Sequence, residues 1–201
     1  MAPEDHKMKI TFILPGGGRA GGIRSTVRIG NELLRKGHNV RVLYRETPMS
    51  LRYVFDMARL WVRYKGVIDW ISTFEGAREP FKDIHECRFE DNEVLIGVGS
   101  WAALEVSSVV GSFAARIHNL RGALPDTDRY LSDALKAPLE RIVVSPHLAG
   151  FVLRETGLAV AGIAPNGVDL DEYFPPDDET ARTGVGGLYG KTPAKDPQTF
   201  L

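Results

Sequence analysis

The stretch that decides the fold is residues 9–44, KITFILPGGGRAGGIRSTVRIGNELLRKGHNVRVLY. Its first six residues form a mostly apolar run that stops at Pro15 and a glycine cluster, which predicts a buried strand followed by a tight turn. An amphipathic helix is expected next, because Ile23, Val27, Gly30 and Leu34 recur at helical spacing before a glycine suited to a C-terminal cap. Residues 39–44 predict a second strand. Strand, helix and strand make a βαβ unit, whose right-handed crossover implies a parallel sheet.

The same alternation continues along the chain. Further strands are expected at residues 93–98, 114–117, 142–144 and 160–164, with a helix at 101–110. Ser145 and Pro146 predict the start of another helix, which Gly157 would end. The sequence therefore predicts an α/β fold with a Rossmann-like parallel sheet and flanking helices.

The end of the chain changes in composition. Residues 169–182 (DLDEYFPPDDETAR) are acidic and contain two prolines, which is typical of a linker. Residues 183–201 begin a strand-like run and a helix that is cut off. We therefore expect an N-terminal domain over 1–168, an interdomain linker over 169–182, and a truncated start of a second domain over 183–201.

Composition limits the classes of function. The 201 residues include 25 basic and 26 acidic ones, a formal net charge of -1, so no overall positive field favours a nucleic-acid partner. The single cysteine, Cys87, excludes an intrachain disulfide, and no apolar segment approaches the length of a membrane span or a secretory signal. A cytoplasmic location is the expectation.

Polar and glycine-rich segments follow the predicted strands, where parallel sheets bind their ligands. The segment Gly16-x-Gly18-x-x-Gly21 matches a dinucleotide fingerprint, although a glycine turn without any ligand also fits. Phosphate contact at the start of the helix is the interpretation that we favour. His118 is expected to end a strand beside this glycine loop, where it is either functional or a structural residue.

One string narrows these interpretations. Residues 165–169 (PNGVD), followed by Tyr173-Phe174-Pro175, resemble the interdomain segment of retaining glycosyltransferases of family 4, which have the two-domain GT-B fold. Residues 32–40 (ELLRKGHNV) and 144–146 (VSP) are similar to parts of that family's first domain, and the similarity covers residues 10–201. This resemblance implies that the chain is the N-terminal half of a GT-B fold.

The resemblance also implies roles for particular residues. Gly21 and Gly22 would line the diphosphate and sugar of the donor, and Asn166 and Gly167 would shape the cleft between domains. His118 would be the catalytic-site residue that faces the donor sugar. The acceptor would lie on the side of Arg24 and Ser100.

The second domain would supply the other donor contacts. Gly187 stands where the family usually has an arginine that grips the diphosphate, and either Lys191 or Lys195 would be the phosphate-binding lysine, with Lys195 assigned to the site. The family's Glu-x7-Glu element would follow Leu201. We therefore expect this chain to be an inactive fragment of the enzyme.

The implied reaction is the transfer of a sugar from a nucleoside-diphosphate sugar, with retention, to a saccharide, lipid-linked or polymeric acceptor. No metal and no other cofactor is expected. The alternatives are an NAD(P)-dependent oxidoreductase with a GxGxxG loop and a non-catalytic binding module. Residues 50–65 (SLRYVFDMARLWVRYK) predict a basic, aromatic helix, which either packs on the sheet or contacts the inner face of a membrane as a peripheral protein.

Overall fold

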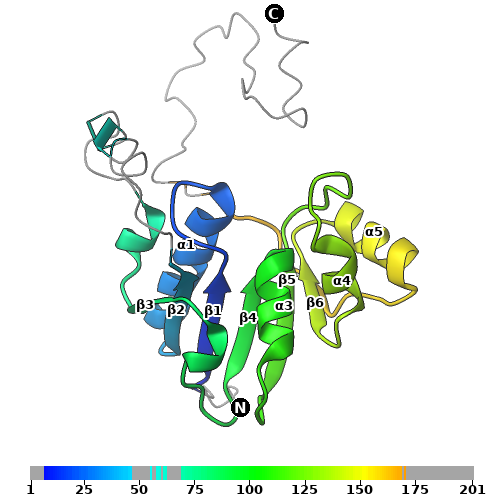
Figure 1. Cartoon of the computed structure of the whole chain (residues 1–201), viewed down its shortest axis with the longest axis horizontal. Coiled ribbons are helices and arrows are strands. Elements are labelled where there is room, and N and C mark those ends of the chain that lie inside the picture. Colours follow the sequence, from blue (N-terminus) through cyan, green and yellow to red (C-terminus); the bar gives the residue numbers. More distant parts are fainter. Residues whose placement is uncertain are drawn as a thin grey trace, which may run out of the picture. The chain divides into compact units, whose positions relative to one another are not determined.

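The computed structural model describes residues 7–46, 55, 58–59, 61–62, 69–168 and 170. Within them, seven strands form one sheet in the order β3-β2-β1-β4-β5-β6-β7, and every neighbouring pair is parallel (Figure 1). The strands are β1 (Lys9–Leu14), β2 (Asn39–Arg45), β3 (Ala77–Phe81), β4 (Val94–Val98), β5 (Ala115–Leu120), β6 (Glu140–Val143) and β7 (Gly162–Ile163). The chain turns back between β1 and β4, as in doubly wound folds. The predicted Rossmann-like α/β fold is confirmed.

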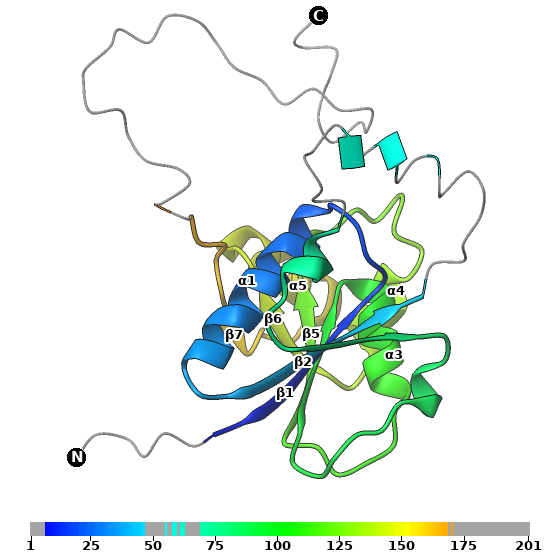
Figure 2. The same cartoon turned by 90° about the vertical axis from the view of Figure 1, so that its left-hand side faces the viewer.

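Helices cover both faces of the sheet (Figure 2). The α-helices are α1 (Gly21–Arg35), α3 (Ser100–Ser108), α4 (Leu131–Lys136) and α5 (Pro146–Thr156), and the short 3-10 helices are η1 (Trp70–Thr73) and η2 (Ile84–Glu86). Helix α1 contacts η1 on one face, whereas α3 contacts α4, and α4 contacts α5, on the other. The two helical layers therefore lie on opposite faces of the sheet, and they separate at the end of β1 after which α1 begins.

Alternate residues of the central strands pack against the helices on the two faces of the sheet. Phe12 and Leu14 of β1 pack in one buried cluster with Ile23 and Val27 of α1. Ile13, between them, packs in a second cluster that includes residues of α3. Because both faces of the strand are buried, β1 is apolar at almost every position, which is the pattern that the sequence displays.

Besides the two short 3-10 helices, one strand and one α-helix were missed by the sequence analysis. Strand β3 pairs only with β2, lies at the edge of the sheet and contains Pro80, which removes a backbone donor and is tolerated at an edge. Helix α4 has six residues, too few to display a helical period. Both lie in segments whose sequence alone resembles a loop.

A buried ion pair joins three strands at the amino end of the sheet. The Glu93 carboxylate is fully buried and accepts hydrogen bonds from the Thr11 hydroxyl and from Nη2 of Arg41, the latter at 3.1 Å. Its second oxygen accepts from the backbone N–H of Glu90 at 3.0 Å. The charge is therefore well compensated, and this cluster is structural.

The chain divides into two compact units, Met1–Asn166 and Gly167–Leu201. Apart from Leu170, the expected linker 169–182 and second domain 183–201, with Gly187, Lys191 and Lys195, lie outside the described residues. Of residues 50–65, the five that are described are helical and exposed, among them Phe55, Trp61 and Val62. No described helix has the length and apolar character needed to cross a membrane.

Candidate functional site

The glycine loop between β1 and α1 is fastened to η1. A Cβ atom on Gly17 would lie 2.3 Å from the Asp69 carboxylate, and Gly18 has a φ of +112°, so both positions favour glycine for local reasons. The Gly18 carbonyl accepts a hydrogen bond from the backbone N–H of Trp70 at 3.1 Å. Asp69 in turn accepts one from the backbone N–H of Ile71 at 2.8 Å. The loop is therefore held in a defined shape.

Gly21 and Gly22, the first two residues of α1, have no such reason to be glycine. A Cβ atom on Gly21 would meet no atom within 4 Å among the described residues, and one on Gly22 would meet only the Arg121 side chain, at 3.5 Å. The first helical hydrogen bonds come from Ile23 and Arg24, whose N–H groups donate to the Ala20 carbonyl. The amides of Gly21 and Gly22 thus precede the hydrogen-bonded ladder, at the positive end of the helix dipole.

Arg121 is the residue of this site that the sequence analysis missed. It directly follows β5, and its Nη2 donates hydrogen bonds to the Ser25 hydroxyl of α1 and to the side-chain oxygen of Asn166. Burial lowers the pKa of its guanidinium below the usual value. Because we expected this strand to end at residue 117, Arg121 resembled an ordinary loop arginine. A strand predicted to end at residue 120 would have placed Arg121 directly after the strand, where ligands of parallel sheets bind.

Asn166 is therefore connected through Arg121 to the first turns of α1. Its side chain is exposed except where Arg121 contacts it. Gly167 begins the second compact unit. Three segments that are far apart in the chain, after β1, β5 and β7, thus contribute neighbouring polar groups.

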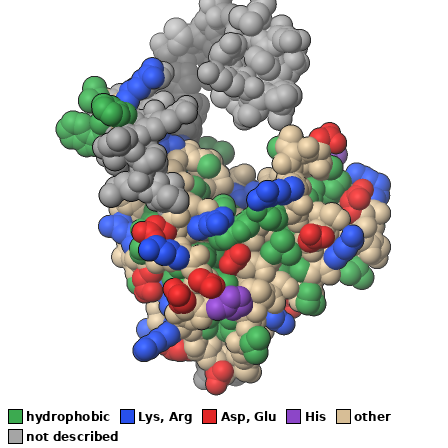
Figure 3. All heavy atoms as spheres, viewed as in Figure 1, with side chains coloured by type: hydrophobic (Ala, Val, Ile, Leu, Met, Phe, Trp, Pro, Cys, Tyr) green, Lys and Arg blue, Asp and Glu red, His purple; other side chains and the backbone are tan. Residues whose placement is uncertain are grey.

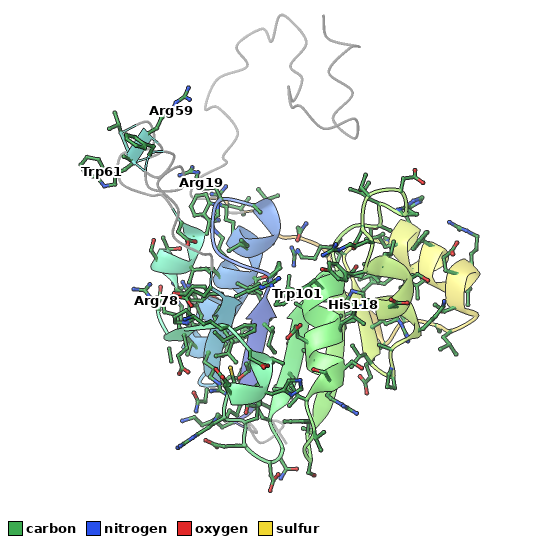
Figure 4. All side chains as sticks on the ribbon, in the orientation of Figure 1. Arg19, Arg59, Trp61, Arg78, Trp101 and His118 are labelled. Atoms are coloured by element: carbon green, nitrogen blue, oxygen red, sulfur yellow. The ribbon has the colours of Figure 1, made fainter. Side chains whose placement is uncertain are left out.

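The expectation that His118 ends its strand is wrong. His118 is the fourth residue of β5, which continues to Leu120, and its register partner is Gly97 in the middle of the sheet. Its side chain is fully buried, and neither ring nitrogen has a hydrogen-bond partner among the described residues. Figure 4 places it inside the fold, among β5, α3 and α4. The strand extends further because Asn119 and Leu120 pair with Ile142 and Val143 of β6.

Ser100, expected on the acceptor side, is almost entirely buried and has a structural partner. Its hydroxyl donates a hydrogen bond of 2.6 Å to the Asp128 carboxylate. Asp128 also accepts from the backbone N–H of Tyr130 at 3.1 Å. Ser100 therefore ties the first residue of α3 to the loop between β5 and α4.

Arg24 lies at the glycine loop together with Arg19. The guanidinium carbons of Arg19 and Arg24 lie 5.0 and 4.8 Å from the centroid of the same Trp70 ring, within the range of cation–π contacts. Figure 4 shows Arg19 beyond the outer end of α1. Of the two acceptor-side residues, the structure thus brings Arg24, and not Ser100, to the glycine loop.

Another arginine–aromatic contact lies at the end of β2. Arg45 is placed over the Trp101 ring at 4.9 Å, and this ring is stacked on Phe81. The neighbouring Glu46 directly follows β2, the second strand of the βαβ unit, and its carboxylate lies 3.6 Å from the ammonium group of Lys82. In a dinucleotide-binding protein, an acidic residue after this strand binds the ribose of the cofactor. Here that residue, Glu46, is close to a lysine at the edge of the sheet.

Basic side chains lie around the start of α1. Acidic residues stabilise helix N-termini, but the first turn of α1 contains none. Arg24 occupies that turn, Arg19 precedes it, and Arg121 packs against Gly22. Elsewhere acidic and basic side chains are interspersed, as on the face in Figure 3. Arg121, beside the Gly21 and Gly22 amides, makes this end of the helix suited to an anionic ligand.

Comparison with known protein families found no family model that matches this chain. A search of curated proteins likewise found no match. Within the ranges that the structure describes, no group of three or more His, Cys, Asp or Glu side chains is placed to hold a metal ion.

Proposed function

We propose that this chain forms the N-terminal half of the active site of a retaining glycosyltransferase that uses a nucleoside-diphosphate sugar. The observation that carries the proposal is the meeting of the Gly21 and Gly22 amides, Arg121 and Asn166 at the start of α1. The glycine amides are hydrogen-bond donors and Arg121 is a cation, so both kinds of group favour an anion. The side-chain oxygen of Asn166 is an acceptor, and it orients Arg121. Asn166 also belongs to the PNGVD string on which the resemblance depends.

The guanidinium of Arg121 is held in an orientation that suits the binding of an anion. Its recorded hydrogen bonds to described residues both use Nη2, which leaves the N–H groups of Nε and Nη1 for a ligand. Ser25 and Asn166 fix the plane of the guanidinium, so little side-chain entropy remains to be lost on binding. The absence of a side chain at Gly22 leaves the space in front of Arg121 open.

In the proposed reaction, the bond between the anomeric carbon and a diphosphate oxygen breaks, and the acceptor hydroxyl oxygen bonds to the same face of that carbon. The acceptor proton passes to the leaving phosphate oxygen, so that no side-chain base is needed. Negative charge grows on the diphosphate during this step. The two glycine amides, the helix dipole and Arg121 would stabilise it, because fixed dipoles need no reorganisation. His118 receives no role, since it is fully buried.

A binding experiment tests the proposal. The ¹⁵N-labelled chain would be titrated with UDP-glucose, GDP-mannose and NAD⁺ while the amide signals of Gly21 and Gly22 are followed. We expect a nucleoside-diphosphate sugar to shift these signals more strongly than NAD⁺. Replacement of one charged hydrogen-bonding group in Arg121→Gln should weaken that binding by about tenfold or more.

Arg129→Gln is the matched control, because Arg129 is an exposed arginine whose recorded contacts are with Tyr130. This variant should bind the nucleotide sugar as the unmodified chain does. Gly22→Val should act like Arg121→Gln, since its methyl groups would fill the space beside Arg121. Tighter binding of NAD⁺, or nucleotide binding that ignores both site variants, would contradict the proposal.

A further inference from the structure

Residues 50–65 include a short helical surface that the proposed donor site does not use. The five residues of this segment that the structure describes are all helical and exposed. The exposed fraction is 75% for Phe55, 60% for Trp61 and 76% for Val62. A helix that packs on a sheet buries its large apolar side chains there. Packing on the sheet, one of the two roles expected for this segment, therefore leaves these three side chains unexplained.

Four of the five residues share one face of the helix. Phe55, Ala58, Arg59 and Val62 follow the spacing i, i+3, i+4 and i+7. They line a shallow hollow whose walls are almost entirely apolar. Trp61 and Arg59 project from the segment in different directions (Figure 4). The face is thus apolar along its length, with an arginine at one edge and a tryptophan beyond the other.

The segment is basic, although the chain as a whole is not. Residues 50–65 contain four basic residues and one acidic residue, a formal charge of +3, in a chain whose formal net charge is -1. Four aromatic residues lie among them. An apolar helical face, aromatic rings and an excess of Arg and Lys are together typical of helices that lie in the surface of an anionic bilayer.

The described face is small for contact with another protein. It extends over residues 55–62, about two helical turns. A stable interface between proteins takes about 20–30 residues from each partner. A bilayer has no such requirement, because its affinity for a helix increases with the apolar area inserted and with the number of basic residues near the surface. Apolar area and charge therefore both favour a lipid surface as the partner.

We infer that the helical surface at residues 55–62 binds an anionic lipid bilayer. Phe55, Trp61 and Val62 insert at the level of the headgroups, and Arg59 contacts the lipid phosphates. Binding of this kind requires neither Arg121 nor a nucleotide, so it is separate from the proposed donor site.

Co-sedimentation of the full chain with vesicles provides the test. The vesicles contain either phosphatidylcholine alone or equal parts of phosphatidylcholine and phosphatidylglycerol. We expect clear binding to the anionic vesicles and much weaker binding to the neutral ones. Added salt should weaken the binding, because it screens the ionic contacts.

Tryptophan fluorescence shows which part of the chain enters the lipid. Emission should move to shorter wavelength when the anionic vesicles bind, because an indole ring leaves water. The chain has three tryptophans, so Trp61→Phe identifies the source. This variant keeps an aromatic side chain and should still bind the vesicles, but the shift in emission should be lost.

Two further variants each remove one kind of contact. Trp61→Ser should lower the partition coefficient on anionic vesicles by about tenfold or more, since a large apolar side chain is no longer buried. Arg59→Gln should lower it about fivefold, the usual effect of one basic residue near the surface. Leu153→Ser and Arg154→Gln are the matched controls, because both residues are exposed on α5, and they should change nothing. Circular dichroism verifies that each variant is folded.

Several outcomes would overturn the inference. Equal affinity for neutral and anionic vesicles, or binding that both Trp61→Ser and Arg59→Gln retain, means that this surface does not hold an anionic bilayer. Loss of vesicle binding in Arg121→Gln, with binding retained in Trp61→Ser, means that lipid phosphate binds at the donor site. A dimer that Trp61→Ser dissociates, without any vesicle binding, means that the face joins two copies of the chain.

Discussion

At the scale of single residues, the burial of His118 makes the stability of the fold depend on pH. Burial first, and the positive charge of Arg141 second, lower its pKa to about 4, although Asp128 opposes this shift. The unfolded chain, with an ordinary histidine pKa, therefore binds a proton at a higher pH than the folded chain does. We expect the contribution of His118 to stability to be complete above about pH 6.5 and to be lost as the pH falls toward 4, by up to about 3 kcal/mol.

Urea unfolding at a series of pH values between about 7 and 5 measures this effect, before most carboxylates titrate. His118→Gln should flatten the dependence of the unfolding free energy on pH in that interval, whatever it does to stability itself. His147→Gln, at an exposed histidine of α5, should leave the slope as it is. An unchanged slope in His118→Gln would show that another group is responsible.

At the scale of elements, Gly97 determines how closely α3 packs on β4. A Cβ atom at this position would lie 2.6 Å from the Ala102 carbonyl oxygen and 2.7 Å from the Ala103 Cα, both backbone atoms that cannot move without the helix. Gly97→Ala should therefore displace α3 and destabilise the fold by about 1–3 kcal/mol, as overpacking does. Denaturant unfolding gives the change in free energy, and the Ser100–Asp128 contact should be perturbed with it.

The matched control is Gly162→Ala in β7, where a Cβ atom would meet nothing within 4 Å among the described residues. Its effect should stay within about 0.5 kcal/mol. If Gly97→Ala is equally mild, close packing of α3 on β4 does not require glycine at this position.

At the scale of the whole molecule, the first compact unit contains every strand of the sheet and all three buried clusters. It also contains the groups of the proposed donor site, from Gly21 to Asn166. We therefore expect a chain that ends at Val168 to unfold in one cooperative transition, because a complete core is present.

Circular dichroism and tryptophan fluorescence, followed through the same urea titration, provide the measurement, and their transitions should coincide. The full chain serves as the reference. A shortened chain that loses its structure gradually would mean that residues beyond 168 complete the core.

Several elements were predictable from the sequence because their signals are local. Ser145 caps α5 by accepting a hydrogen bond from the Leu148 N–H, and Gly157 ends that helix with a φ of +71°, both as expected. The apolar run of β1 and the helical spacing in α1 likewise act over a few residues. Propensity, capping and period therefore determined the order of the main elements and the parallel sheet.

The tertiary structure decided which side chains meet. Arg121 and Ser25 are 96 residues apart, and their contact depends on β5 pairing next to β4 and on how far β5 extends. The strand ends at Leu120 and not at residue 117, and this extension, which no local signal encodes, places His118 inside the sheet and not at the end of its strand. Gly21, Gly22 and Arg24 were named from the sequence, whereas Arg121 beside Gly22 was not, because strand register and helix packing are set by the whole core.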